Sequence, residues 1–167
     1  MNEIYTYRPS YGWLWVFGIG LFILGALLLP TILFWQQSPL WVSIMDLGIG
    51  LIIGVPFIYI GLQIPGIRYA LADDALHISM GRLIHYTVRY QDIESVVSKN
   101  LSISLWAGMR FPGLALFKVI YVDEGLVNMC ATSAATNILL IKTGSAKFGI
   151  TPSNEAEFVQ SLMSKLK

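Results

Sequence analysis

Two long stretches without charged side chains constrain this fold more than any other feature of the chain. Residues 13–35 contain no charge, and residues 41–63 contain only Asp46. As helices that rise ~1.5 Å per residue, each stretch is roughly 34 Å long, which is enough to cross the hydrocarbon core of a bilayer. The connection "QQSP" between them is so short that the helices must run antiparallel. The sequence therefore predicts a two-helix transmembrane hairpin within residues 1–66, with spans at about 13–35 and 41–63.

The basic residues predict how this hairpin is oriented. The connection carries none, whereas Arg8 and Arg68 flank the open end of the hairpin. Lys and Arg are enriched on the cytoplasmic side of membrane helices. Both termini are therefore expected in the cytoplasm.

Three residues inside the predicted spans are candidates for helix contacts or function. Gly50 and Gly54 form a G-x-x-x-G pair, which allows close helix approach within one hairpin or between two copies. Asp46 is a carboxylate inside a span and so is a functional candidate by default. Three interpretations of Asp46 are open: a side chain at the outer membrane interface, a polar contact within or between hairpins, or part of an ion or proton path.

The composition changes at residue 67. Ten of the 11 Lys and Arg residues, and eight of the 10 Asp and Glu residues, lie from Arg68 onward. Residues 67–167 therefore indicate a globular domain large enough for one small core. Segments such as "LHISM" and "IHYTVRY" alternate apolar and polar residues, which predicts antiparallel strands. We expect about seven strands in a bent β-sandwich, with a C-terminal helix whose stripe of Phe158, Leu162 and Leu166 covers one open end.

One stretch of this domain, residues 101–117, is long, apolar and rich in turn-forming residues. Two interpretations are open: a segment that covers the core, or a surface that meets lipid or a protein partner. The candidate contact residues are those of the types that anchor such surfaces: Trp106, Met109, Arg110, Phe111 and Leu114.

The remaining reactive side chains predict no chemistry. His77 and His85 lie on the polar faces of neighbouring strands, either opposite each other or opposite Thr87 and Ser79 respectively. Two imidazoles without a nearby carboxylate or thiolate rarely hold a metal ion. The sequence places no base beside Cys130, the only cysteine. We expect no catalytic residue, metal or cofactor, and the small positive charge of the domain does not indicate nucleic-acid binding.

Several segments together resemble the bacterial PH-domain proteins, in particular those with a membrane hairpin ahead of the domain. They are "RYALADDALHI", "QDIESV", "MRFPGLALF", "GLVNMCATSAATNILLIKT" and "FGITPSNEAEFVQSL". The most specific parts are Pro112-Gly113, the "CAT" that ends at Thr132, and the "TP" ahead of Phe158. The resemblance implies a PH-like fold of seven strands and a C-terminal helix, with no agreed activity.

One departure from PH domains that bind phosphoinositides bears on the ligand. Those domains carry basic residues between their first two strands, where this chain has "ADDA" with Asp73 and Asp74. Two carboxylates would repel an anionic head group. No specific phosphoinositide binding is therefore expected.

These observations predict an α+β membrane protein: a two-helix transmembrane hairpin followed by a PH-like bent antiparallel β-sandwich with a C-terminal helix. The predicted function is a non-catalytic binding or scaffold module, tethered to the bacterial cytoplasmic membrane, that binds a protein or self-associates at the cytoplasmic face. The alternative is a small transport or channel component assembled from hairpin oligomers around Asp46.

Overall fold

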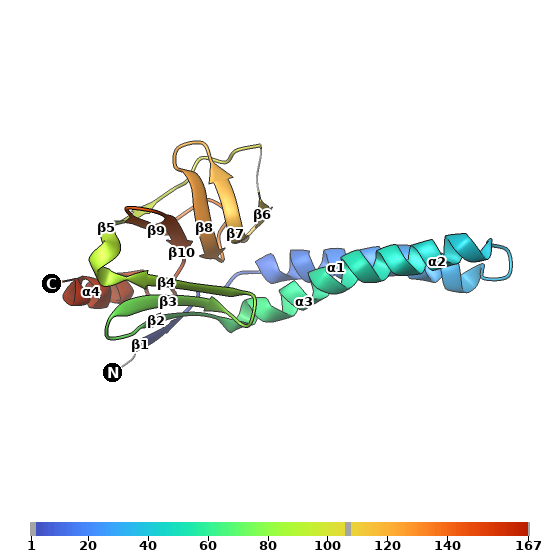
Figure 1. Cartoon of the computed structure of the whole chain (residues 1–167), viewed down its shortest axis with the longest axis horizontal. Helices are drawn as coiled ribbons and strands as arrows, with labels where there is room; N and C mark the ends of the chain where they lie inside the picture. The colour runs from blue at the N-terminus through green and yellow to red at the C-terminus, as the bar shows by residue number, and fades with distance from the viewer. Residues whose placement is uncertain (1–2, 106–107, 167) are drawn as a thin grey trace. The chain divides into compact units, whose positions relative to one another are not determined.

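The computed structural model describes residues 3–105 and 108–166 and has an α+β architecture (Figure 1). Its residues fall into two compact units. One is the helical hairpin of Trp13–Ile64, and the other is a β-rich domain formed by the chain on both sides of that hairpin, Met1–Gly12 and Pro65–Lys167. The two units are described separately below.

The hairpin consists of two long apolar helices. Its first helix is α1 (Gly12–Leu33). The second is continuous but changes pitch, and its parts are α2 (Leu40–Ile49), the π-helical turn η1 (Gly50–Gly54), α3 (Val55–Gln63) and the 3₁₀ turn η2 (Ile64–Gly66). Pro56 lies just after the π-helical turn. Proline lacks the backbone N–H that donates a helical hydrogen bond, and a local change of pitch is a common way for a helix to accommodate it.

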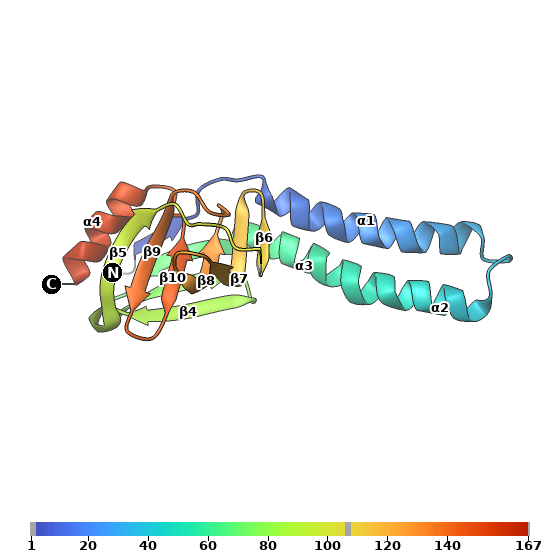
Figure 2. The ribbon, with the colours of Figure 1, turned by 90° about the horizontal axis from the view of Figure 1, so that it is seen from above.

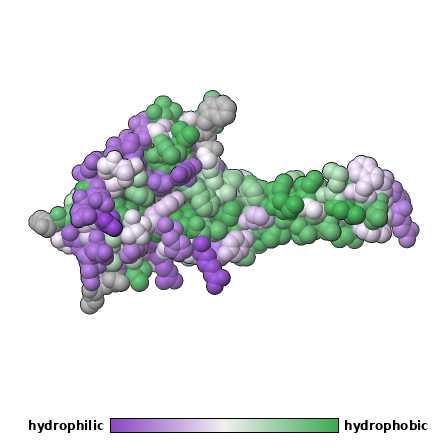
Figure 3. Space-filling view, viewed as in Figure 1, coloured by the Kyte–Doolittle hydropathy of each residue, from purple (hydrophilic) through white to green (hydrophobic). Residues whose placement is uncertain are grey.

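Both helices are long and apolar enough to cross a membrane. Gly12–Leu33 has 22 residues and a mean hydropathy of 2.5, and Leu40–Gly66 has 27 residues and a mean hydropathy of 2.1. Little of either helix is buried inside the structure. Figure 3 shows an almost wholly hydrophobic hairpin surface, with hydrophilic residues gathered at the turn.

Glycines allow the two helices to approach closely. A Cβ atom placed on Gly54 would lie 2.6 Å from Leu24 Cγ, and one on Gly20 would lie 2.9 Å from the carbonyl oxygen of Gly54. A Cβ atom on Gly50 would lie 3.6 Å from Leu27 Cβ. Both glycines of the G-x-x-x-G pair therefore face α1 of the same hairpin.

The domain contains two β-sheets (Figure 2). The antiparallel four-stranded sheet has the order β1 (Glu3–Thr6), β2 (Ile67–Leu71), β3 (Ala75–Met80), β4 (Ile84–Arg89). The six-stranded sheet has the order β5 (Ile93–Lys99), β9 (Ile138–Thr143), β10 (Lys147–Ile150), β8 (Gly125–Ala131), β7 (Leu114–Tyr121), β6 (Met109–Phe111). In the second sheet β10 runs parallel to β8. The 3₁₀ turn η3 (Tyr90–Asp92) leads from one sheet to the other.

The seven strands expected from the sequence are present as β3, β4, β5, β7, β8, β9 and β10. In the described part of the chain the structure adds β1, β2 and β6, and β1 changes the domain boundary. It pairs antiparallel with β2, so that Glu3 lies opposite Leu71 and Thr6 opposite Arg68. The hairpin is therefore an insertion between two neighbouring strands. The boundary expected between residues 66 and 67 is corrected, because the described part of the first twelve residues belongs to the domain.

The helix α4 (Glu155–Lys165) closes the domain core as the sequence predicts. Phe158 and Leu162 are fully buried, whereas Leu166, the third residue of the expected stripe, is partly exposed. The Phe158 ring packs edge to face on Tyr5 and Tyr69, with ring centroids 5.2 Å and 6.3 Å away. One end of the core therefore depends on a residue that precedes the hairpin.

Candidate functional site

The segment that leads from β5 to β6 begins as a cover for part of the core. Leu101 is buried in a cluster with Val119, Tyr121 and Met129 of the six-stranded sheet. The backbone N–H of Leu101 donates to the carbonyl oxygen of Ala135 at 2.7 Å. This part of the segment therefore has the core-covering role that the sequence left open.

The structure places the five candidate contact residues in different environments. Trp106 lies outside the described residues. Met109, Arg110 and Phe111 form the partly exposed edge strand β6. Leu114 starts β7 and is fully buried, so its side chain is not part of the described surface. The expectation of a contact role for Leu114 is corrected, because its side chain is withdrawn from solvent.

Arg110 is held by groups of the domain itself. Its Nη2 donates to the carbonyl oxygen of Ser104 at 2.9 Å, and its guanidinium carbon lies 6.0 Å from the centre of the Tyr121 ring. Nη1 is buried without a hydrogen-bond partner among the described residues. Burial raises the pKa of Tyr121 to about 12, against the opposing effect of the Arg110 charge. Tyr121 is therefore neutral beneath the guanidinium at physiological pH.

An exposed apolar patch lies near this segment, on residues that the sequence analysis did not select. Ile120 is paired with Leu126 across β7 and β8, and Val122 follows Ile120 by two positions, just after the end of β7. Ile120, Val122 and Leu126 are all exposed, and we call these three residues the apolar patch. A hydrophobic area is visible on this otherwise mostly hydrophilic domain surface in Figure 3. The signal in the sequence is an apolar residue at strand positions where alternation predicts a polar one.

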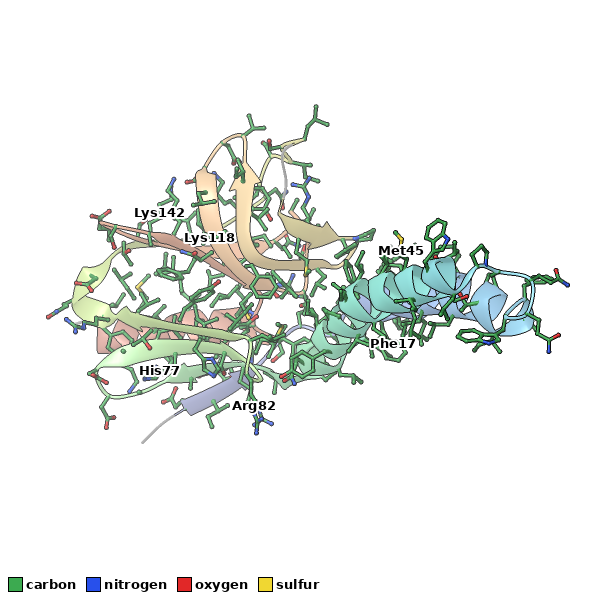
Figure 4. The ribbon with its side chains drawn as sticks, turned by 45° about the vertical axis from the view of Figure 1, so that its right-hand side comes forward. Phe17, Met45, His77, Arg82, Lys118 and Lys142 are labelled. Atoms are coloured by element: carbon green, nitrogen blue, oxygen red, sulfur yellow. The ribbon has the colours of Figure 1, made fainter. Side chains whose placement is uncertain are left out.

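A buried carboxylate and three lysines form a second cluster that the sequence analysis missed. Glu124, in the turn between β7 and β8, pairs with Lys99 at 2.7 Å, Lys142 at 3.0 Å and Lys147 at 2.8 Å. Hydrogen bonds from Lys147, Lys99 and Lys142 lower the pKa of Glu124 to about 2, although burial opposes this change. The three lysines come from β5, β9 and β10, so the cluster ties one turn to three strands. Lys142 is labelled in Figure 4.

The strand register separates the two histidines. His77 lies opposite Thr87, with Nδ1 3.2 Å from Thr87 Oγ1, and His85 lies opposite Ser79. His77 is exposed on β3 (Figure 4). In the residues that the structure describes, no group of three or more His, Cys, Asp or Glu side chains is placed to hold a metal ion.

Cys130 is a packed thiol. It is fully buried on β8, and burial raises its pKa to about 12. The thiolate, which is the nucleophilic form, is therefore disfavoured at neutral pH.

Asp46 has a polar neighbour on the facing helix of its own hairpin. Thr31 Oγ1 lies 3.4 Å from Asp46 Oδ2 and also donates to the carbonyl oxygen of Leu27 at 2.8 Å. Of the three interpretations from the sequence, this geometry corresponds to a polar contact within the hairpin.

The motifs that carry the family resemblance meet around the N-terminal segment, which we define as residues 3–12. Thr132 Oγ1 donates to the carbonyl oxygen of Arg8 at 2.6 Å, and Thr151 accepts from the backbone N–H of Arg8 at 2.8 Å. Ser10 donates to the carbonyl oxygen of Gly113, which has a φ of 73° and follows Pro112 in the tight turn between β6 and β7. These motifs therefore bind a part of the chain that lies more than 100 residues earlier in the sequence.

Two β-sheets closed at one end by a C-terminal helix define a PH-like class of domain. A family model described as Bacterial PH domain matches residues 67–166. The chain therefore belongs to the bacterial PH-domain family, as its sequence motifs indicate. No curated protein and no solved structure matches the chain.

Proposed function

We propose that this chain is a membrane-tethered, non-catalytic binding module whose domain lies at the cytoplasmic face of the bacterial membrane. The observation that carries the proposal is the insertion of the apolar hairpin between β1 and β2. Both ends of the hairpin continue into strands of one sheet. If the hairpin crosses the bilayer, both ends must lie on the same side, and the domain is held there by two connections.

The surface of the domain supports a protein rather than an inositide lipid as the partner. The family is generally non-catalytic. Contiguous exposed apolar residues, as in the apolar patch, are typical of protein contact sites. Asp73 and Asp74, which are exposed between β2 and β3, disfavour an anionic head group. The partner in this proposal is a protein or a second copy of the chain.

The tethering is tested by fractionation and protease access in bacterial cells. The chain carrying a C-terminal tag should remain in membranes after alkaline carbonate extraction. Protease added to intact spheroplasts should spare the tag and should digest it after lysis. Extraction of the chain by carbonate would show that the proposed anchoring is wrong. Digestion of the tag before lysis would show that the proposed orientation is wrong.

The binding role is tested separately with a photoreactive residue in place of Val122, in the apolar patch. It should give a discrete adduct with a protein or with a second copy of the chain in living cells. The matched control places the same residue at His77, which is exposed on β3. Equal labelling at both positions, or none at Val122, would contradict a contact at the patch.

A further inference from the structure

The strand β5 presents an unpaired backbone edge. It is the first strand of the six-stranded sheet, and among the described residues its strand partner is β9 alone, with an unbroken register from Ser95 to Lys99 and a bulge at Glu94. The four central residues of β5, Ser95 to Ser98, carry no charge. A strand edge exposes a row of N–H and C=O groups that are complementary to another strand. Most natural edges are blocked by charges, by proline, by a β-bulge or by a covering segment, and in β5 the bulge and the exposed Glu94 are confined to its N-terminal end.

The other sheet edges of the described chain are shorter or blocked. The edge strand β6 has three residues, and β4 carries the exposed side chains of His85 and Arg89. The chain next to β1 is engaged, because Ser153 donates to the carbonyl oxygen of Thr6 and Tyr7 pairs with Pro152. The edge of β5 is therefore the one best suited to accept a further strand.

A groove lies between β5 and α4. It has a volume of about 440 Å³ and is lined by Val96, Ser98, Leu139, Glu155, Ala156 and Val159. Four of these six side chains are apolar, and Glu155 is neutralised by an ion pair with Arg8 at 3.1 Å. In Figure 2, α4 lies beside β5 at this end of the six-stranded sheet. A strand added to β5 would direct alternate side chains to the face that carries Val96 and Ser98, which is the face that lines the groove.

The acidic residues at one end of β5 indicate which charge the ligand carries there. Asp92 and Glu94 are exposed at the N-terminal end of the strand, and the structure shows no ion pair between either and a described residue. In antiparallel pairing the C-terminal end of an added strand lies beside the N-terminal end of β5. Basic residues at that end of the ligand would complement these two carboxylates.

We propose that β5 and α4 form a peptide-binding groove. Its ligand is an extended segment of a partner protein that pairs antiparallel with β5, places alternate apolar side chains between β5 and α4, and ends in basic residues beside Asp92 and Glu94. This mode of recognition draws affinity from backbone hydrogen bonds and selectivity from alternate side chains. The inference rests on the proposed binding function and names the kind of partner.

The test uses the full chain in lipid nanodiscs and a defined probe. The probe is a fluorescent peptide in which valine and threonine alternate over the length of β5 and two lysines follow. Fluorescence anisotropy should show saturable binding. Amide hydrogen exchange should show added protection in β5. Replacing two threonines of the probe with proline, which lacks the N–H that pairs, should abolish binding. Moving the lysines to the N-terminal end should weaken it several-fold.

Two variants of the chain locate the site, each with a matched control. Ala156→Trp fills the groove and should weaken probe binding by about tenfold or more. Gln160→Trp adds the same side chain at an exposed position of α4 that does not line the groove, and it should leave binding unchanged. Glu94→Lys should weaken binding several-fold, whereas Lys118→Glu on β7 should not.

The outcomes separate this inference from the proposed function. Absence of probe binding, or binding that is insensitive to Ala156→Trp and to the prolines, would overturn the groove. If the crosslinker at Val122 still captures a partner in that case, the binding function stands and only its location at β5 is wrong. If neither the probe nor the crosslinker reports a contact, both proposals are wrong.

Discussion

The hydroxyl group of Thr132 donates a hydrogen bond of 2.6 Å to the carbonyl oxygen of Arg8, a residue 124 positions earlier in the chain and on the other side of the hairpin. The same hydroxyl lies 3.0 Å from Thr151 Oγ1, and the N–H of Arg8 donates to the carbonyl oxygen of Thr151. The N-terminal segment is therefore a structural part of the domain.

The first prediction concerns the domain without its N-terminal segment. Residues 67–167 alone lose β1, which is one of the two strand partners of β2, the ring contact between Tyr5 and Phe158, and the hydrogen bonds of Arg8. We expect this fragment to be less stable by at least about 3 kcal/mol than a fusion in which a Gly/Ser linker joins residues 1–12 to 65–167. Urea unfolding followed by circular dichroism measures the difference. Equal unfolding midpoints for the two proteins would show that the N-terminal segment does not stabilise the domain.

The second prediction concerns the end of the core. Phe158 is fully buried against Tyr5 and Tyr69, so Phe158→Ala should lower the free energy of unfolding by about 3–5 kcal/mol. The control is Lys165→Ala in the last turn of the same helix, for which a change below about 0.5 kcal/mol is expected. Denaturant unfolding of the full chain in detergent provides the comparison. Similar losses for both variants would mean that α4 is not packed through its apolar stripe.

The strands with local patterns could be predicted from the sequence, and those without them could not. Segments such as "LHISM" alternate in full and became β3, and the stripe of Phe158 and Leu162 predicted the buried face of α4. Glu3–Thr6 is short, and its partner strand begins more than 60 residues later, so no local period marks it as a strand. Pairing across an insertion of that length is a tertiary property.

The candidate site shows the same limit. Anchor residue types in the 101–117 stretch could not distinguish buried Leu114 from the exposed Ile103 nearby. The cluster around Glu124 joins four elements, and a single sequence carries no signal that brings Lys99, Lys142 and Lys147 to one carboxylate. The groove beside β5 depends on the order of strands in the sheet, which periodicity alone does not determine.

The third prediction is a pH dependence caused by Glu124. Its pKa falls from an ordinary value of 4.5 to about 2 in the folded state, because of hydrogen bonds from Lys147, Lys99 and Lys142. A carboxyl group whose pKa is lowered by folding adds stability above its unfolded pKa. That stability is lost as the pH falls through the folded pKa. The contribution of Glu124 should therefore be complete above about pH 5 and should disappear between about pH 4.5 and 2.

The matching variant is Glu124→Gln, which keeps the shape of the side chain and removes its charge. It should be less stable than the parent chain at pH 7, and this difference should shrink as the pH falls from 5 towards 2. Asp92→Asn, at an exposed carboxylate, serves as the control and should show little difference at either pH. Unfolding midpoints at several pH values supply the data. A difference between Glu124→Gln and the parent that does not change with pH would contradict the assignment.

The last prediction concerns the helix contact in the hairpin and uses two glycines of the same long helix. A Cβ atom at Gly54 would meet Leu24 at 2.6 Å, whereas one at Gly48 would have no atom within 4 Å. Gly54→Val should therefore force the helices apart and cost about 1–3 kcal/mol, the usual range for overpacking a close contact. Gly48→Val should be tolerated. Thermal unfolding in detergent, followed by tryptophan fluorescence, compares the two variants.

The same pair of variants distinguishes contacts within one hairpin from contacts between copies. If Gly54 serves only its own hairpin, Gly54→Val should lower the unfolding temperature without changing the oligomeric state measured by light scattering. If the glycine face instead joins two chains, Gly54→Val should dissociate an oligomer while each monomer keeps its unfolding temperature. Because Gly20 and Gly54 approach each other through backbone atoms of α1 and the second helix, we expect the first result.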